Sequence, residues 1–248
     1  MKFDIVTIFP RMVESGLAEG VVSRGIERRL LDVEVHDLRS YTTDRHRSVD
    51  DVPYGGGPGM VMKPEPLARA VEAIRSRRGD PGAVVLLSPQ GRQFTQAEAV
   101  GMSRIPHIVL LCGRYEGVDE RVRTSVATDE LSIGDYVLSG GELPALVVVD
   151  AISRLIPGVV GDARSVDEDS FSRGLLDCPH FTRPPEFAGQ RVPGVLLSGH
   201  HEEVRRWRKM TALRRTLERR PELLASAALD DEERAMLEAI RKEEEREP

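Results

Sequence analysis

The chain of 248 residues has few cysteines and few aromatic residues, and each shortage excludes a class of protein. Its two cysteines, Cys112 and Cys178, are far apart and form no CxxC pair. This excludes a disulfide scaffold and a cysteine-based zinc site and favours a reducing compartment, the cytoplasm. Aromatic residues make up 4% of the chain, so we expect base stacking to be sparse in any nucleic-acid complex.

Long apolar runs and phosphate-binding glycine motifs are also missing. No run approaches the roughly 20 apolar residues that cross a bilayer, and no cationic segment followed by an apolar stretch opens the sequence. We therefore expect no membrane partner and no secretory address. Neither GxGxxG nor GxxxxGKS/T occurs, which counts against the ordinary dinucleotide and nucleoside-triphosphate sites.

Charge is distributed unevenly along the chain. The formal net charge is −6, and residues 222–248 alone contain ten acids and four bases, so residues 1–221 are neutral on balance. Within that neutral part, residues 205–220 (RRWRKMTALRRTLERR) contain eight arginines or lysines and one acid. A local basic face of this kind attracts phosphate, although the same run is also typical of a solvated helix surface.

Residues 2–160 alternate between short apolar runs and helix-like stretches. The apolar runs are KFDIVTIF (2–9), DVEVHDL (32–38), AVVLLSP (83–89), HIVLLCG (107–113) and LSIGDYVL (131–138). The helix-like stretches are VVSRGIERRLL (21–31), PLARAVEAIRSRR (66–78), TQAEAVGMS (95–103), VDERVRT (118–124) and LPALVVVDAISRLI (143–156). This alternation is typical of a parallel sheet with helices on both faces, so we predict an α/β domain over residues 1–160. Residues 39–62 are too rich in glycine and proline for a helix or strand and predict a long functional loop.

The pattern changes after residue 160. Residues 161–172 (GDARSVDEDSFS) are small and polar, which is typical of an interdomain linker. Helical spacing of apolar and basic residues then predicts helices at 201–219 and 230–246, the second starting with acids that complement a helix dipole. We therefore predict a second domain over residues 173–248 that is small and mostly helical.

Glycine-containing loops follow three of the predicted strands. They are SPQG (88–91), GRYEG (113–117) and IGDYVLSGGELP (133–144). Each loop alone is typical of a simple turn. In open α/β sheets, however, ligands bind at the carboxyl ends of strands near a switch in strand order, so the three loops can share one pocket. The polar residues inside them are Ser88, Gln90, Glu116, Asp135 and Tyr136.

Several strings of the sequence match one known family. They are YGGGPGM (54–60), GRYEGVDERV (113–122), SIGDYVLSGGELPA (132–145), DRHR (44–47), LSPQGR (87–92), DSF (169–171), GLLDCPH (174–180) and LLSGHH (196–201). In these strings, and over nearly its whole length, the chain resembles the bacterial tRNA (guanine-N1)-methyltransferase family of the TrmD type. The resemblance implies an S-adenosylmethionine-dependent enzyme that methylates N1 of the guanine immediately 3′ of the anticodon, at tRNA position 37.

The resemblance also implies how the methyl donor is bound. It predicts a deep trefoil knot of the SPOUT class, in which main-chain groups of the knotted loops hold the donor, so that glycine leaves room for it. The implied donor-binding residues are Leu86, Leu87, Ser88, Pro89, Gly113, Tyr115, Glu116, Gly117, Ile133, Gly134, Tyr136, Leu138, Gly140, Gly141 and Pro144.

The acceptor chemistry calls for one base and one cation. N1 of guanine bears a proton at neutral pH, and negative charge builds on O6 as the methyl group arrives. The resemblance matches the base to Asp169 and the cation to Arg154. Without the resemblance, we would interpret Asp169 as part of a solvated acidic linker and Arg154 as a surface cation that favours the carboxyl end of a helix. A magnesium ion could assist at O6 in this family, but no run has the spacing of a magnesium site, so metal dependence stays open.

The histidines do not indicate a metal site or a catalytic triad. His46, His180, His200 and His201 lack a matched cysteine, serine or carboxylate spacing, so we predict neither a metal site nor a catalytic triad there.

The expected partners are tRNA and a second copy of the chain. Residues 205–220 with Trp207, and the DRHR run at 44–47, would contact phosphates of an anticodon loop, whose unpaired bases can be splayed out. The resemblance implies a homodimer in which one subunit supplies the donor loops and the other supplies Asp169. Two rival functions are a non-catalytic RNA-binding protein and a nucleotide-dependent oxidoreductase or hydrolase. The first predicts decayed donor loops and the second a phosphate-binding glycine motif, and the sequence has neither.

Overall fold

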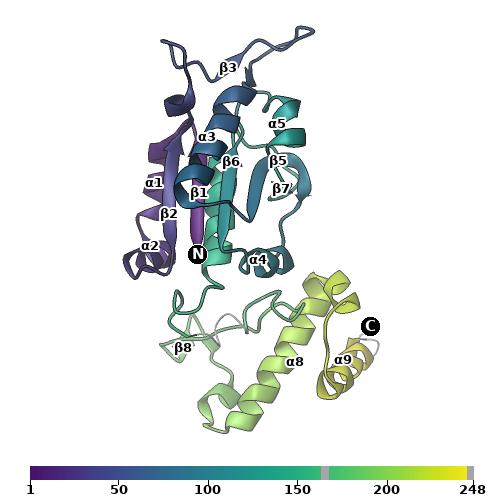
Figure 1. Cartoon of the computed structure of the whole chain (residues 1–248). Coiled ribbons are helices and arrows are strands. Elements are labelled where there is room, and N and C mark those ends of the chain that lie inside the picture. Colours follow the sequence, from purple (N-terminus) through teal and green to yellow (C-terminus); the bar gives the residue numbers. More distant parts are fainter. Residues whose placement is uncertain (163–167, 245–248) are drawn as a thin grey trace. The chain divides into compact units, whose positions relative to one another are not determined.

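The computed structural model describes residues 1–162 and 168–244 (Figure 1). The chain divides into two compact units, Met1–Ala163 and Arg164–Pro248, and the division falls inside the segment 161–172. Residues 163–167 of that predicted linker, and residues 245–246 of the second predicted helix, lie outside the described residues.

The first unit contains a five-stranded sheet in which every neighbouring pair of strands is parallel. Its strands are β1 (Lys2–Thr7), β2 (Asp32–Asp37), β5 (Ala83–Gln93), β6 (His107–Cys112) and β7 (Asp129–Ser132), in the order β2-β1-β6-β5-β7. Its helices are α1 (Pro10–Leu17), α2 (Gly20–Glu27), α3 (Pro64–Arg78), α4 (Gln96–Met102), α5 (Glu120–Ser125) and α6 (Glu142–Ser153). The prediction of an α/β fold with a parallel sheet is confirmed.

Helices cover both faces of this sheet, as its apolar strands predict. Phe3 and Ile5 of β1 pack on one face with residues of α1, α2, α4 and α6. Val6 of β1 packs on the opposite face with residues of α3 and α5. Because side chains alternate along a strand, runs that are apolar at every position require this two-sided cover.

Three sequence predictions for this unit need correction. The apolar run 131–138 is not one strand, because β7 ends at Ser132 and Gly134 has a φ of +146°, which a regular strand does not adopt. Helix α1 was not predicted, although Pro10 at its first position is a typical start signal. The loop 39–62 is not wholly irregular, since it contains a 3₁₀ helix at Leu38–Tyr41 and a short antiparallel pair, β3 (Asp50–Asp51) with β4 (Val61–Met62).

The second unit is built around α8 (His201–Arg219) and α9 (Asp231–Glu244). Both helices begin within one residue of the predicted positions. A two-stranded hairpin, β8 (Glu186–Phe187) with β9 (Gln190–Arg191), and 3₁₀ helices at Gly194–Leu197 and Pro221–Ala225 complete the regular elements among its described residues. Its core contains Leu175, Leu213, Met236 and Ile240. No helix in the described part of the chain is both long and apolar enough to span a membrane.

Candidate functional site

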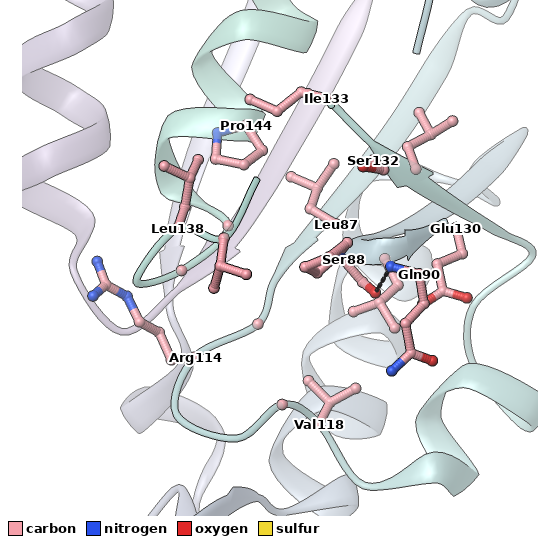
Figure 2. A pocket seen from close by; sticks show the side chains of 18 of the residues that line it. Leu87, Ser88, Gln90, Arg114, Val118, Glu130, Ser132, Ile133, Leu138 and Pro144 are labelled. Atoms are coloured by element: carbon pink, nitrogen blue, oxygen red, sulfur yellow. Dashed lines mark hydrogen bonds between the residues drawn. The ribbon is translucent and has the colours of Figure 1, made fainter. Parts of the chain in front are cut away.

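Residues 86–90 of β5 and the loops after β6 and β7 enclose one cavity of about 360 Å³ in the first unit. The two loops leave the carboxyl ends of β6 and β7, on either side of β5 in the order β6-β5-β7, and ligands bind at such strand ends in open α/β sheets. The predicted loop SPQG (88–91) belongs to β5 itself, where the pairing with β7 shifts register between Leu87 and Arg92. Figure 2 shows the apolar side chains of Leu138 and Pro144 on one side of this view and the polar side chains of Gln90 and Glu130 on the other. The three predicted segments therefore share one cavity, but SPQG reaches it as an irregular part of β5 and not as a loop after the strand.

Glycine allows two segments, one within β5 and one in the loop after β7, to pass directly over the main chain of their neighbours. A Cβ atom at Gly91 would lie 2.5 Å from the backbone of Glu130 and Leu131, where the pairing of β5 with β7 shifts register. A Cβ atom at Gly141 would lie 2.7 Å from Cys112 Cα. Both distances are far below van der Waals contact, so a residue with a side chain would push the segments apart.

A tight turn forms the start of the loop after β7. Gly134 N donates to Ser132 Oγ across 3.3 Å, and Tyr136 Oη donates to the Ile133 carbonyl across 3.2 Å. The Tyr136 ring then covers Gly134, where an added Cβ would lie 2.6 Å from the ring. The turn directs the main chain of residues 133–141 along the cavity.

All fifteen predicted donor-binding residues line this cavity. Ten further residues line the cavity, of which only Gln90 was named from the sequence, as a polar residue of the segment 88–91. The signal for the other nine is proximity to the three segments. The ten are Gln90, Arg114, Val118, Glu120, Arg123, Glu130, Leu131, Ser132, Val137 and Ser139. Two of these ten are glutamates, Glu120 and Glu130, and Glu116 makes a third acid at the cavity wall, beside the cations Arg114 and Arg123. The cavity therefore combines apolar side chains, main-chain groups and negative charge.

A buried ion pair ties the cavity to the start of α6. Glu142 is fully buried; its Oε2 accepts from Arg114 Nε across 2.9 Å and its Oε1 from Thr7 Oγ1 across 2.7 Å. The Arg114 guanidinium also lies 4.5 Å from the centre of the Phe9 ring, a cation–π geometry. A buried carboxylate is costly unless it is paired in this way.

The loop 54–62 packs against the loop after β6. Glu116 N donates to the Met60 carbonyl across 3.0 Å, and Met62 N donates to the Gly117 carbonyl across 2.9 Å. Gly59 has a φ of +80° and is covered by the Glu116 side chain, so a larger residue there would displace that carboxylate. The end of the string YGGGPGM, Gly59 and Met60, therefore supports the wall of the cavity.

The two predicted catalytic residues belong to different units. Arg154 follows α6 directly, whereas Pro144, in the first turn of that helix, lines the cavity. Ten residues of helix separate them by about 15 Å, and Arg154 does not line this cavity. Asp169 lies in the second unit and lines another cavity, of about 330 Å³. Asp169, Glu168, Asp177 and Glu233 line that cavity together with Arg173, His201, Arg205, Arg208 and Lys209.

Acids of α9 neutralise part of the basic face of α8. Arg205 Nη1 lies 2.8 Å from Glu232, Lys209 Nζ lies 2.6 Å from Asp230, and Arg214 Nη2 lies 2.6 Å from Glu243. The hydrogen bonds from Arg205 and Lys209 lower the pKa of Glu232 to about 2. Arg206, Arg208 and Arg219 are exposed and pair with no acid in the described part of the second unit. Residues 205–220 therefore present less unpaired positive charge than their eight cations suggest.

The sequence matches one family model, described as tRNA (guanine-1)-methyltransferase TrmD, over residues 1–226. The chain belongs to this TrmD family. It is 56% identical over 241 residues to the tRNA (guanine-N(1)-)-methyltransferase of Pelotomaculum thermopropionicum, which covers 97% of this chain and 96% of the relative. Relatives of the same name from Geobacter metallireducens (53%, 96% of each chain) and Halalkalibacterium halodurans (49%, 99% of this chain and all of the relative) are similar in extent.

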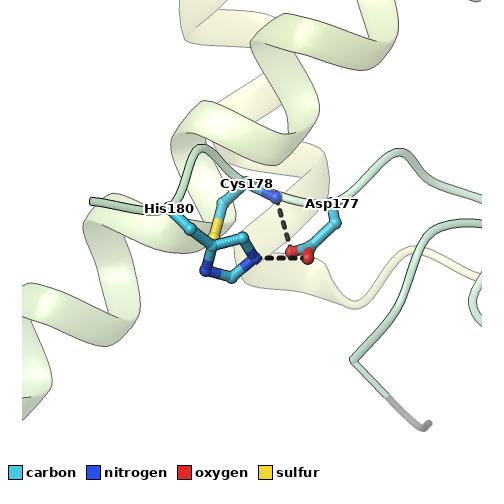
Figure 3. A group of neighbouring side chains, drawn as sticks. All are labelled: Asp177, Cys178 and His180. Atoms are coloured by element: carbon cyan, nitrogen blue, oxygen red, sulfur yellow. Dashed lines mark hydrogen bonds and ion pairs between the residues drawn. The ribbon is translucent and has the colours of Figure 1, made fainter. Parts of the chain in front are cut away.

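In this TrmD-family chain, one histidine has a neighbour that the sequence spacing did not indicate, while the absence of a metal site or triad there stays a prediction. His180 does have a carboxylate partner: its Nε2 lies 2.6 Å from Asp177 Oδ2, and the Cys178 side chain lies beside both (Figure 3). The string D-C-P-H places the three side chains within four residues, and Asp177 Oδ1 also accepts from Cys178 N across 2.6 Å, so both oxygens of this carboxylate are engaged. Burial and the adjacent Asp177 charge raise the pKa of the Cys178 thiol to about 11, so it stays protonated at neutral pH.

Proposed function

We propose that the protein transfers a methyl group from S-adenosylmethionine to N1 of guanine 37, the guanine immediately 3′ of the anticodon of tRNA. The observation that carries the proposal is the membership of the TrmD family over residues 1–226, with relatives named tRNA (guanine-N(1)-)-methyltransferase matched over nearly their full length. A tRNA substrate favours the cytoplasm as the compartment of the protein. The two free cysteines, Cys112 and Cys178, favour it too, because thiols stay reduced there.

The cavity of the first unit suits this donor. Gly134 and Gly117 have φ values of +146° and +129°, so their main-chain groups adopt orientations that a side chain would hinder. Leu138 and Pro144 offer an apolar surface for the adenine, and Glu116 offers negative charge near a sulfonium cation. When bound, S-adenosylmethionine supplies an electrophilic methyl group. We assign residues 1–160 to donor binding and residues 173–248 to tRNA binding.

The acceptor chemistry falls to Asp169 and Arg154 in this proposal. The Asp169 carboxylate takes the proton from N1 of guanine, which frees the N1 lone pair. The Arg154 guanidinium stabilises the charge that develops on O6. Since guanine 37 lies in a loop, taking it out of the stack costs less than opening a duplex. Assays with and without Mg²⁺ test whether a metal ion shares the task of Arg154.

The exposed cations of α8 suit the phosphate backbone of tRNA. Arg206, Arg208 and Arg219 lie on the surface, and each phosphate that they neutralise releases counterions. Trp207 packs against the Phe181 ring, with 6.2 Å between centroids, so it adds little stacking surface beyond that pair. We expect salt-sensitive binding in which phosphate contacts dominate.

Calorimetry with three ligands tests the donor assignment and separates the rival functions. We expect the protein to bind S-adenosylmethionine and neither NAD nor ATP, because it lacks a phosphate-binding glycine motif. Binding of NAD or ATP in its place would support a nucleotide-dependent oxidoreductase or hydrolase. Donor binding without methyl transfer to any tRNA would support a non-catalytic RNA-binding protein.

The active site is shared between two subunits in this proposal. One chain separates Arg154 from its own donor cavity by most of α6. Large apolar side chains are exposed at the start of α1 and along α6: Phe9 (43%), Met12 (38%), Leu143 (47%) and Val147 (46%). These two helices pack against each other, so the four side chains form one apolar surface that a second copy can cover.

A mixture of two inactive variants tests the shared site. Gly141→Val blocks the donor loops and Asp169→Ala removes the base, and each homodimer should be inactive. Mixing the two variants after dissociation should restore about a quarter of the wild-type activity. About half of the dimers are then mixed, and one of the two sites in each mixed dimer is intact. Persistent inactivity of the mixture, with both variants folded and dimeric, counts against a shared site.

We also propose that the donor loops form a trefoil knot. The close crossings at Gly91 and Gly141 support it, because both segments pass within backbone contact of neighbouring strands. Knots are nearly absent from proteins as a class, so the proposal requires its own test. Pulled from its two ends, a knotted chain should extend to less than the contour of its 248 residues. Extension to the full contour would exclude the knot.

A further inference from the structure

Main-chain hydrogen bonds fold the segment that contains Asp169 back on itself. Phe171 N donates to the Leu175 carbonyl across 2.7 Å, and Ser172 N donates to the Asp169 carbonyl across 3.2 Å. Phe171 and Gly174 have φ values of +71° and +76°, which reverse the chain. We call residues 169–177 the Asp169 loop. Its course is fixed by its own backbone and is not that of an open linker.

Thr216 of α8 fastens the far end of the Asp169 loop. Thr216 is fully buried, and its Oγ1 accepts from Leu176 N across 3.0 Å while donating to the Ala212 carbonyl across 2.8 Å. The neighbouring Leu175 side chain is buried in the core with Leu213. A buried amide that loses its acceptor is strongly disfavoured, so the loop would have to move if this hydroxyl were removed.

The fastened end is linked directly to the residues beside Asp169. Asp177 N donates to Ser170 Oγ across 3.0 Å, and Ser170 N donates to Asp169 Oδ1 across 3.0 Å. A displacement of Leu176 therefore reaches the Asp169 carboxylate through two hydrogen bonds. A second anchor joins the middle of the loop to α9, where Arg173 Nη2 lies 2.8 Å from the buried carboxylate of Glu233.

We propose that Thr216 is a positioning residue for the base: it holds the Asp169 loop on α8 so that the carboxylate meets N1 of guanine. The inference rests on the proposed function for the role of Asp169. A general base acts only within hydrogen-bond reach of the proton that it takes, and a displacement of about 1 Å can cost about a hundredfold in rate. Thr216 itself touches neither the donor cavity nor, in this account, the guanine.

Three variants of the full-length protein test the proposal. Thr216→Val keeps the shape of the side chain but removes the hydroxyl, and Thr216→Ser restores the hydroxyl. Thr211→Val is the matched control, because Thr211 lies on the same helix and its hydroxyl donates to the Trp207 carbonyl across 2.8 Å, while it bonds to no described residue of the Asp169 loop. For each variant we would measure the single-turnover transfer rate at saturating tRNA, the Kd for tRNA and the Kd for S-adenosylmethionine.

We expect Thr216→Val to lower the transfer rate by about 10- to 100-fold, with both Kd values within about twofold of wild type. Thr216→Ser should recover most of the rate, and Thr211→Val should retain it. A Thr216→Val transfer rate within about twofold of wild type would overturn the proposal. A loss confined to tRNA affinity would overturn it too, since that is the result of a purely structural role.

Hydrogen exchange provides a readout that does not depend on the reaction. In Thr216→Val, and not in Thr211→Val, the amides of residues 169–177 should exchange faster than in wild type. If the wild-type protein methylated no guanine, the proposed function would fail, while exchange would still decide whether Thr216 holds the loop. Unchanged exchange in Thr216→Val would overturn the inference by itself.

Discussion

The Arg114 guanidinium donates from Nε to the fully buried Glu142 carboxylate across 2.9 Å, and this pair joins the donor loop after β6 to the first turn of α6. Removing one partner of a buried pair leaves the other charge without compensation. Glu142→Gln should therefore lower the free energy of unfolding by about 3 kcal/mol and weaken donor binding. Glu186→Gln, in the exposed Arg191–Glu186 pair, is the control and should cost at most about 1 kcal/mol. Urea unfolding and donor calorimetry measure both effects, and equal losses in the two variants would contradict the prediction.

The close passage of Gly141 over Cys112 predicts a loss of donor binding when a methyl group is added. The new Cβ of Gly141→Ala would lie 2.7 Å from Cys112 Cα, so the loop must shift, and overpacking of this kind costs about 1–3 kcal/mol. The matched substitution is Gly101→Ala in α4, where no described heavy atom lies within 4 Å of the added Cβ. That variant should gain about 0.5–1 kcal/mol, because alanine favours a helix. Calorimetry that finds wild-type donor affinity in Gly141→Ala would exclude the main-chain clamp.

A buried charge network at β1 predicts how stability depends on pH. Asp4 Oδ1 accepts from His36 Nε2 and Oδ2 from His107 Nε2, each across 2.6 Å, and Arg78 Nε lies 3.0 Å from Oδ2. Burial alone would raise the pKa of Asp4, but the two histidine hydrogen bonds and the Arg78 charge outweigh it and hold the pKa below 3.8. The folded protein thus binds the Asp4 proton less tightly than the unfolded chain. This contribution to stability is complete above pH 3.8 and is lost as pH falls through the lower folded pKa.

Asp4→Asn should remove that contribution. We expect its free energy of unfolding at pH 7 to be lower by about 3 kcal/mol, since the substitution removes the buried carboxylate that His36, His107 and Arg78 share, while Arg78 keeps its pairs with Asp32 and Glu34. Its decline between pH 4 and pH 2 should be shallower than that of wild type. Asp80→Asn is the control, because Asp80 pairs with Arg75 at the exposed end of α3. Urea unfolding at several pH values measures both, and a steeper acid decline in Asp4→Asn would show that the sign is wrong.

Pairing between α8 and α9 predicts the salt dependence of tRNA binding. Glu232 pairs with Arg205 and Lys209, which also pair with Glu202 and Asp230, so Glu232→Gln removes one of the acids that each cation shares and makes positive charge available to phosphate. The slope of log K against log salt should steepen by about 0.7–0.9 for each cation released. Glu238→Gln is the control, since Glu238 is exposed on the same helix and pairs with no cation in the described part of that unit. Identical slopes for the two variants would mean that α9 does not limit the tRNA-binding charge.

Local patterns were enough to predict much of the fold, because each pattern is decided within a few residues. Helix α8 is found at the predicted residues 201–219, where spacing alone indicates one amphipathic face. The convergence of the three glycine-containing segments also follows from a general property of parallel sheets. The donor-binding residues came from the family resemblance, and the cavity that they line could not be derived from spacing.

Contacts between distant segments account for what the sequence did not predict. Glu142 is 135 residues from Thr7, and Glu232 is 27 residues from Arg205, so no local pattern indicates either pair. The loop 54–62 was predicted as a loop, but its packing on Glu116 depends on a partner 57 residues from Gly59. The carboxylate partner of His180 was overlooked for the opposite reason: Asp177 is only three residues away, a spacing that matched none of the motifs considered.

The identity of the atom that receives the methyl group tests the proposed function most directly. Mass mapping of a tRNA transcript with guanine at both positions after the anticodon, incubated with the protein and S-adenosylmethionine, measures this directly. We predict one added methyl group, on N1 of guanine 37, and none in Asp169→Ala. Methylation of another atom or nucleotide, or full activity in Asp169→Ala, would contradict the account.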